Sequence, residues 1–592
     1  MNYFLFSQPF RKGARVIVLL ALLLSSFGYG GTSVAYAAPP AHDDFDAAKL
    51  INAIEYHDTV NTTEATPNDV VTNVVVGDPD NFLCEDDTGV SRIIRYGYTS
   101  IWYKYTPPEA QSLSLDATGK EINSNISLDL FIAVWTGTQG NLALVACNDE
   151  THAGFPELSF VANAGTTYYI EIAQYNNGQN NTNVFGGNVS FNAFITNTNV
   201  EIGGDLRGRY FVPESGGLRR SFLNLDSGPV EITNVAGNQI IAAERVIYRP
   251  GGVYTSFSEL MGLPDNQLDT IYWFPWYNNV GLETQLRIGN VSNSTANVTI
   301  TIGGAPVPGG SFSLGVGESK RVSFQGIDDG PVKVVSTQNI VAAERVIYRP
   351  GGVYTSFSEV MGLPNSELGT TYWLPWYNNI GLDTQLRIGN VSNSTANVTI
   401  TIGGAPVFGG SFSLGVGESK RVSFKGIDKG PVKIVSTQNI VAAERVVYNV
   451  AGVPVSFNEI MALPNNQLDT IYWFPWYNNI GLDTQLRFGN VSNSQTATVR
   501  IYIGGQEVTG SPFTLQPGAS KRQSFPNIDN GPVRIESNID IVAAERVIYK
   551  VDGQFTSFSE MMGLPNGLLD SKYWMPWYNN FGLDTQLRFA LP

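Results

Sequence analysis

Four copies of an aromatic stretch are the most conspicuous residues that could bind a ligand. "TIYWFPWYNN" occupies residues 270–279 and recurs, slightly changed, at 370–379, 470–479 and 571–580. Successive side chains of a strand point to opposite faces, so this stretch is aromatic on both faces. We expect one face to fill a domain core; the other either packs against the next domain or forms a platform for stacking sugar rings. The platform residues would be Trp276, Tyr277, Trp376, Tyr377, Trp476, Tyr477, Trp577 and Tyr578.

Charged pairs within apolar runs are the second feature. Each repeat contains "AAER" and "TQLR", which place an acid and a base in the middle of expected strands. Structural ion pairs that fix strand register would account for them, and a ligand-binding pair at a repeat interface is the alternative. The predicted pairs are Glu244 with Arg287, Glu344 with Arg387, Glu444 with Arg487, and Glu545 with Arg588.

Acidic loops before residue 200 are the candidate metal ligands. Hard oxygen ligands from loops suit Ca²⁺, although the spacing is not that of a helix-loop-helix site. Solvated turn acids are the favoured interpretation, and a calcium cofactor in this region is the alternative. The candidate ligands are Asp43, Asp44, Asp46, Asp86, Asp87 and Asp149.

The sequence contains few residues suited to nucleophilic catalysis. Residues 200–592 contain neither His nor Cys, which removes Ser-His-Asp and Cys-His systems and imidazole or thiolate zinc sites from that region. Paired carboxylates could hydrolyse glycosides, but four near-identical tandem active sites would be unusual. We therefore expect no enzyme activity.

The elements that position these residues form a repeat of about 100 residues. Pro275, Pro375, Pro475 and Pro576 mark the period, and the phase places units at 198–298, 299–398, 399–498 and 499–592. Short alternating runs separated by Gly, Asp and Asn turns predict β-sandwiches. The Ser-x-x-Glu spacing at 256–259 predicts one helical turn. We expect the four units to form an extended stalk.

The N-terminal part differs in composition and targeting. Residues 1–37 read as a signal peptide, with a basic start, the apolar run 16–24 and a small-x-small site at 35–37. In an exported chain, Cys84 and Cys147 are expected to form a disulfide. The net charge of −16 argues against nucleic acid as a partner, and no later segment predicts a membrane span.

Residues 41–197 resemble bacterial pre-peptidase C-terminal-type domains. The resemblance lies in "DDFDAA" (43–48), "SIWYKYTPP" (100–108), "LDLFIAVWTG" (128–137), "LVACNDE" (144–150) and "NAGTTYYIEI" (163–172), in that order. It implies a jelly-roll-like β-sandwich with an accessory, non-catalytic role beside a secreted enzyme, although no peptidase is present in this chain. The 100-residue units more loosely resemble Ig-like repeats of bacterial surface proteins.

Together these features predict an all-β protein, secreted and retained at the cell surface or free in the extracellular space. Its role would be structural or adhesive, with an extracellular polysaccharide or protein as partner. A carbohydrate-binding protein with one Trp/Tyr platform in each repeat is the alternative, in which four weak sites would gain avidity.

Overall fold

The computed structural model describes residues 38–65, 82–85, 91–94, 96–122, 126–149, 155–176, 186–248, 256–348, 356–450, 453–551 and 554–592. It is 65% strand and 3% helix, which confirms the all-β prediction. The predicted signal peptide lies outside the described residues. Within them, no helix has the length and apolar character needed to cross a bilayer.

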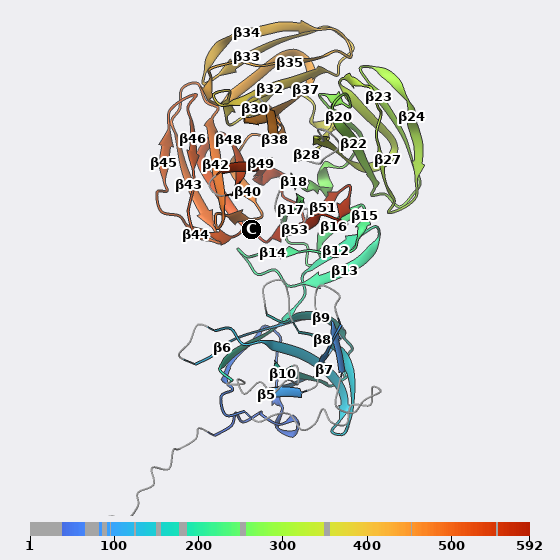
Figure 1. The fold of residues 1–592 in the computed structure, drawn as a ribbon, viewed down its shortest axis with the longest axis vertical. Helices are drawn as coiled ribbons and strands as arrows, with labels where there is room; N and C mark the ends of the chain where they lie inside the picture. Colours follow the sequence, from blue (N-terminus) through green and yellow to red (C-terminus); the bar gives the residue numbers. More distant parts are fainter. Residues whose placement is uncertain are drawn as a thin grey trace, which may run out of the picture.

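The N-terminal domain is a two-layer sandwich (Figure 1). One sheet has the order β1 (Lys49–Leu50), β5 (Tyr96–Tyr105), β10 (Tyr168–Asn176), β7 (Leu130–Thr138), β8 (Asn141–Asn148). The other has the order β2 (Tyr56–Asn61), β11 (Asn188–Ile195), β6 (Gln111–Lys120), β9 (Glu157–Ala162). Alternate residues of β9 and β11 are buried, as expected for strands with one face on a core. A 3-10 helix, η1 (Phe45–Ala47), and the hairpin of β3 (Phe82–Glu85) and β4 (Ser91–Ile94) complete it.

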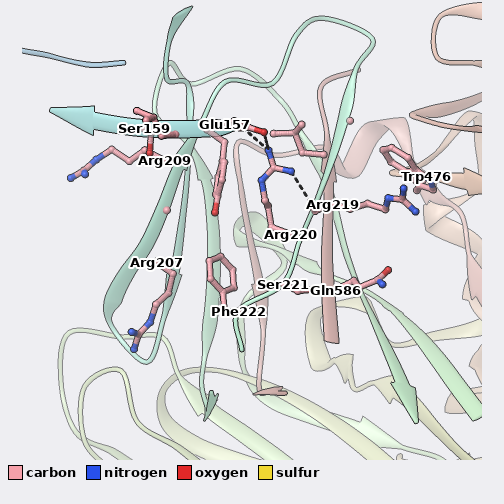
Figure 2. Close-up of a pocket in the computed structure, with 15 residues that line it drawn as sticks. Glu157, Ser159, Arg207, Arg209, Arg219, Arg220, Ser221, Phe222, Trp476 and Gln586 are labelled. Carbon is pink, nitrogen blue, oxygen red and sulfur yellow. Dashed lines mark hydrogen bonds and ion pairs between the residues drawn. The ribbon is translucent and has the colours of Figure 1, made fainter. Parts of the chain in front are cut away.

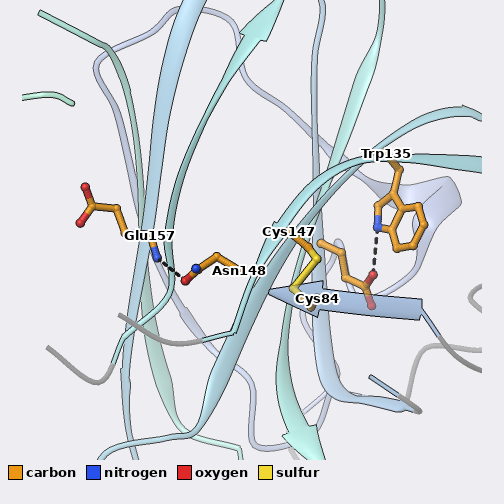
Figure 3. The surroundings of a disulfide bond; sticks show 6 residues. Cys84, Trp135, Cys147, Asn148 and Glu157 are labelled. Atoms are coloured by element: carbon orange, nitrogen blue, oxygen red, sulfur yellow. Dashed lines mark hydrogen bonds between the residues drawn. A yellow bond between two sulfur atoms is a disulfide. The ribbon is translucent and has the colours of Figure 1, made fainter. Parts of the chain in front are cut away.

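The predicted disulfide is present in this domain. Cys84 on β3 is bonded to Cys147 on β8, with their Cα atoms 5.5 Å apart. Beside it, the indole N–H of the buried Trp135 donates to Glu171 Oε2 at 3.1 Å (Figure 3). The bond therefore ties the β3–β4 hairpin to the edge of the five-stranded sheet.

The four 100-residue units are also two-layer sandwiches, and in three of them one long strand runs through both layers. In the unit that we call unit B, the first half of β27 (Val332–Tyr348) pairs with β20 (Asp269–Phe274) and β23 (Ala296–Ile302). Its second half pairs with β22 (Glu283–Asn290) and β28 (Ser356–Met361). The remaining elements of unit B are β21 (Tyr277–Asn278), β24 (Ala305–Leu314), β25 (Ser319–Val322), β26 (Asp328–Asp329), β29 (Leu363–Pro364) and the 3-10 helix η6 (Asn365–Glu367).

Units C and D repeat this arrangement. Unit C contains β30 (Gly369–Leu374), β31 (Tyr377–Asn378), β32 (Leu382–Asn390), β33 (Ala396–Ile402), β34 (Ala405–Leu414), β35 (Ser419–Val422), β36 (Asp428–Lys429), β37 (Val432–Val450), β38 (Val453–Met461), β39 (Leu463–Pro464) and η7 (Asn465–Gln467). Unit D contains β40 (Asp469–Phe474), β41 (Tyr477–Asn478), β42 (Leu482–Asn490), β43 (Ala497–Ile503), β44 (Gln506–Glu507), β45 (Phe513–Leu515), β46 (Ser520–Gln523), β47 (Asp529–Asn530), β48 (Val533–Val551), β49 (Gln554–Met562), β50 (Leu564–Pro565) and η8 (Asn566–Leu568).

The fourth sandwich, unit A, is built from two distant segments of the chain. One of its sheets has the order β13 (Asp205–Tyr210), β12 (Thr198–Ile202), β16 (Val230–Asn234), β51 (Lys572–Met575), β19 (Leu263–Pro264). The other has the order β14 (Gly217–Arg220), β53 (Asp584–Ala590), β17 (Ile241–Tyr248), β18 (Ser256–Met261). The small pair β15 (Asp226–Ser227) and β52 (Tyr578–Asn579) and the 3-10 helix η4 (Asp265–Gln267) complete unit A.

This closure corrects the prediction of an extended stalk. Strands from residues 572–590 lie in the middle of both sheets of unit A, so the four sandwiches form a closed ring, with red and cyan-green strands side by side in Figure 1. It also moves the boundaries of the units: a sandwich begins near residue 269, 369 or 469, about 30 residues before the predicted starts at 299, 399 and 499. The period was right and its phase was not.

The centre of the ring is filled by one strand from each unit: β18, β28, β38 and β49 (Figure 1). Ser256 Oγ lies 3.4 Å from Ser356 Oγ, and Ser356 Oγ lies 3.4 Å from Ser456 Oγ. The backbone N–H of Glu359 donates to Ser258 Oγ of the preceding unit at 2.8 Å. The prediction of a helical turn at 256–259 is therefore wrong. These residues form a buried strand, because tertiary packing overrides the local helix-cap signal.

A cysteine pair across the closure tests the ring directly. Gly217 and Ala590 are register partners on β14 and β53, and a Cβ on Gly217 would lie 3.3 Å from the Ala590 Cβ. That approach is close to the usual disulfide spacing. We expect the Gly217→Cys/Ala590→Cys double variant to form an intramolecular disulfide, seen as faster migration on a non-reducing gel. Each single variant is the control, and a double variant that forms only intermolecular dimers would contradict the closed ring.

Candidate functional site

Buried Glu–Arg clusters lie between neighbouring units. In unit B, Glu359 Oε1 accepts from Arg345 Nε at 2.6 Å and from Arg287 Nη1 at 2.9 Å, and all three side chains are almost completely buried. The same acceptor role falls to Glu259, Glu459 and Glu560 in the other units. Because the Arg of "TQLR" and the Arg of "AAER" share one carboxylate, this cluster fastens three strands of a sheet.

The predicted ion pairs therefore lack the residue that accepts the hydrogen bond from each "TQLR" arginine. Arg287, Arg387, Arg487 and Arg588 donate to the Glu of "SFSE" or "SFNE" rather than to the predicted Glu244, Glu344, Glu444 and Glu545. The sequence did contain a signal for the true acceptor, namely a Glu at the same place in every repeat. The Ser-x-x-Glu spacing around that Glu favours a helix cap in the sequence, whereas in the structure the Glu lies on a strand and accepts from both arginines.

The "AAER" glutamates complete each cluster from the preceding unit. Burial raises the pKa of Glu244 to about 8, with Glu359 adding to the rise and Arg345 and Arg287 opposing it. Burial likewise raises the pKa of Glu344, Glu444 and Glu545. Burial would also raise the pKa of Glu359, but Arg345 and Arg287 outweigh it and hold that pKa below its ordinary value. Each interface thus contains two Glu and two Arg in a dry setting.

The raised pKa values predict a pH-dependent stability. In the unfolded chain, the four "AAER" glutamates lose their protons above about pH 4.5. In the folded ring, Glu244 keeps its proton up to about pH 8. The folded state then binds more protons than the unfolded state, so stability falls as the pH rises through this window. We expect a lower urea midpoint at pH 8.5 than at pH 5.5. A variant with Gln at 244, 344, 444 and 545 should lose most of this slope; an unchanged slope would contradict the assignment.

The tyrosines of the aromatic stretch lie in the sandwich cores. Tyr277 is completely buried, its hydroxyl donates to Thr284 O at 2.9 Å, and it accepts from the backbone N–H of Phe324 at 2.6 Å. Tyr377, Tyr477 and Tyr578 are equally buried and make the equivalent bonds to Thr384, Thr484 and Thr585. These four side chains therefore have no surface on which a sugar ring could stack.

The tryptophans of the same stretch lie between units. Trp276 Nε1 donates to Asp328 Oδ1 at 2.7 Å, and the Arg421 guanidinium of unit C lies 4.6 Å from the centre of the Trp276 ring. Arg421 also lies 3.5 Å from Asp328, so the three residues form one contact across the interface. Trp376 with Arg522, Trp476 with Arg219, and Trp577 with Arg321 repeat it around the ring. The arginine occupies one face of each indole that the platform hypothesis would assign to sugar.

The candidate metal ligands do not converge in the part of the domain that the structure describes. Asp43 and Asp149 are buried, whereas Asp44 and Asp46 are exposed. Among the described residues, no three His, Cys, Asp or Glu side chains gather where they could hold a metal ion. Asp86 and Asp87 lie outside the described residues.

A cavity of about 620 Å³ lies at the joint between the N-terminal domain and the ring (Figure 2). Four arginines line it: Arg207, Arg209, Arg219 and Arg220. Arg220 binds both carboxylate oxygens of Glu157 at 2.6 Å, which joins β14 of the ring to β9 of the N-terminal domain. Arg207 pairs with Asp205, and Arg219 lies 3.5 Å from Asp529. Three of the four arginines that line the cavity are therefore engaged in ion pairs with other residues of the protein.

The contacts at this joint are expected to restrict the orientation of the N-terminal domain relative to the ring. Only two residues separate β11 from β12, and Phe194 stacks on Phe211 with ring centroids 4.0 Å apart. We expect Arg220→Ala to loosen the joint without unfolding either part, since the pair is partly exposed and such pairs contribute about 1 kcal/mol or less. Small-angle scattering should then show a broader distance distribution. The matched control is Arg500→Ala, which removes a surface pair within unit D; equal effects of the two changes would contradict the proposed joint.

Comparisons with known proteins give no family. No protein-family model and no curated protein matches the chain. Matches among solved structures include the tandem CBM22 domains of Paenibacillus barcinonensis Xyn10C (TM-score 0.12, 9% identity, 41% of this chain and 75% of that chain). The CUB1-EGF-CUB2 domains of rat MASP-1 match with a TM-score of 0.11 and 12% identity over 49% and 95% of the two chains.

A glycoside hydrolase family 32 structure from Bifidobacterium adolescentis matches with a TM-score of 0.15 and 7% identity over 83% and 97% of the two chains. Scores this low carry no argument about fold or function. The resemblances of residues 41–197 and of the repeats to known domain types therefore stay predictions.

Proposed function

We propose that the protein is an exported, non-catalytic adhesive protein, in which the closed ring is a rigid body that presents its outer surface to an extracellular polysaccharide or protein. One observation carries the proposal: the charged and aromatic residues that recur in all four units are used inside the ring. The Glu359 cluster and the Trp276–Asp328–Arg421 contact hold units together. Contacts to a partner are then left to the outer loops and hairpins, where the repeats differ.

A pull-down of residues 38–592 on insoluble cellulose, chitin and peptidoglycan tests the proposal, with calcium and with chelator. We expect retention on at least one of these materials and no release of soluble sugar or peptide during prolonged incubation. Release of soluble product would contradict a non-catalytic role. Failure to bind any of the three, or immobilised extracellular proteins, would contradict an adhesive one.

The same assay distinguishes this proposal from the alternative in which the tryptophans form sugar-binding platforms. Trp276→Phe, Trp376→Phe, Trp476→Phe and Trp577→Phe together keep an aromatic ring at each interface but remove the bond to the aspartate. We expect lower thermal stability with unchanged binding, because the indoles are interface residues. Loss of binding by a variant whose circular dichroism is unchanged would favour sugar platforms instead.

A further inference from the structure

A groove on unit C concentrates the differences between two nearly identical repeats. Residues 284–346 and 384–446 differ at only four positions. One is the conservative core change from Val334 to Ile434. The other three replace Pro308 by Phe408, Gln325 by Lys425 and Asp329 by Lys429. All three of the replacing residues line one groove of about 700 Å³, whose wall also includes Ile380 in place of Val280.

The three replacements change the chemistry of this groove in a concerted way. Phe408 is fully exposed beside the half-exposed Ile380. Lys425 and Lys429 raise the local charge by three units relative to unit B, one from replacing Gln and two from replacing Asp. The other two units have Thr509, Pro526 and Asn530, or Gly208, Leu223 and Ser227, at the equivalent positions. Unit C is thus the one unit with an aromatic ring and two ammonium groups here.

The two lysines are available to a ligand. The backbone of Lys429 pairs with Tyr377, but the side-chain ammonium groups of Lys425 and Lys429 make no hydrogen bond or ion pair with any residue in the described part of the chain. Asp428, which also lines the groove, is already engaged by Trp376 Nε1 at 2.7 Å and lies 3.8 Å from Arg522. Two ammonium groups without side-chain partners beside a large exposed apolar ring give this groove a positive charge in a chain with net charge −16, and such a combination suits an anionic ligand with an apolar face.

We propose that this groove is a binding site for an acidic polysaccharide made of uronic-acid sugars. A pyranose ring has an apolar face that can stack on Phe408, and its carboxylate can reach the lysine ammonium groups. An open groove suits a chain that extends beyond the bound unit, whereas an enclosed pocket would suit a free sugar. The inference deepens the proposed adhesive function by naming a ligand class and a single site.

Reversion of the groove to the unit B residues tests the inference with a built-in safeguard for folding. The variant is Phe408→Pro, Lys425→Gln and Lys429→Asp, a combination that unit B already carries in the same sandwich. The probe is polygalacturonate, measured by isothermal titration on residues 38–592. We expect wild-type binding that weakens with salt, and at least a tenfold lower affinity in the variant. The converse variant, Pro308→Phe, Gln325→Lys and Asp329→Lys, should bind with about twice the stoichiometry.

Two further polymers identify what is recognised. Fully methyl-esterified polygalacturonate keeps the sugar rings without charge and should bind at least tenfold more weakly. Poly-glutamate supplies charge without sugar, and binding as tight as that of polygalacturonate would overturn the glycan assignment in favour of an acidic peptide. Equal affinities of wild type and reverted variant, or no wild-type binding to polygalacturonate, would overturn the site. Retention on insoluble material that the reversion leaves intact would keep the adhesive function and reject only this groove.

Discussion

Glu359→Ala will destabilise the ring by about 3–5 kcal/mol, because it leaves the Arg287 and Arg345 guanidinium groups buried without their shared acceptor. Both arginines are almost completely buried, so water cannot replace the carboxylate without opening the interface. Chemical denaturation followed by tryptophan fluorescence measures the loss. The free energy of unfolding of Glu359→Gln should lie between those of Glu359→Ala and wild type, because the amide oxygen still accepts a hydrogen bond but lacks the charge.

Asp205→Asn is the matched control for this prediction. It removes the carboxylate from an ion pair with Arg207 in which Asp205 is largely exposed. Surface pairs of this kind contribute less than about 1 kcal/mol. If Glu359→Ala shifts the denaturation midpoint no more than Asp205→Asn does, the buried cluster is not what holds neighbouring units together.

Removal of residues 572–592 will unfold unit A and open the ring. The deletion takes away β51 and β53, each of which lies between two other strands of a sheet. It would leave the edge of β16 unpaired and separate β14 from β17, and unpaired edges of this kind promote association between chains. We expect rapid proteolysis within residues 198–264 and oligomers by size-exclusion chromatography with light scattering.

Addition of a separate peptide covering residues 569–592 is the informative control for the deletion. The peptide carries the missing strands in the order that unit A uses, so it should restore protease resistance and the monomer. A truncated chain whose residues 198–264 stay as resistant as in wild type would show that the C-terminal strands are not needed there.

Much of the fold could be predicted from the residues themselves. Alternation and turn residues identify strands, and the 100-residue period identifies four equivalent sandwiches. The phase of the period could not be predicted, because a row of units and a ring of units repeat the same residues in the same order. What distinguishes them is the pairing of β16 with β51, between residues more than 300 apart, and no local pattern encodes such a contact.

The candidate site shows the same limit at the level of single residues. The aromatic content predicts that one face of the stretch fills a core, but it does not identify that face, and Tyr277 and its equivalents are buried although they were candidate platform residues. The Arg421 that covers Trp276 comes from the next unit and has no local signal in the aromatic stretch. Ser256 and Glu259 have the spacing of a helix cap, yet buried contacts with neighbouring units make them part of a strand. Local propensity was overridden where four copies of one strand meet.

The assembly of unit A from both ends of the ring sequence has a consequence for biosynthesis. Residues 198–264 leave the ribosome first among the ring residues, but the strands that lie in the middle of their two sheets are synthesised last. Units B, C and D can each complete their sheets as they emerge, whereas unit A must wait as an unfinished sandwich for more than 300 residues. The order of folding is therefore expected to run B, C, D and then A, and the period of greatest exposure to proteases and to misassociation is the interval before the last strand arrives.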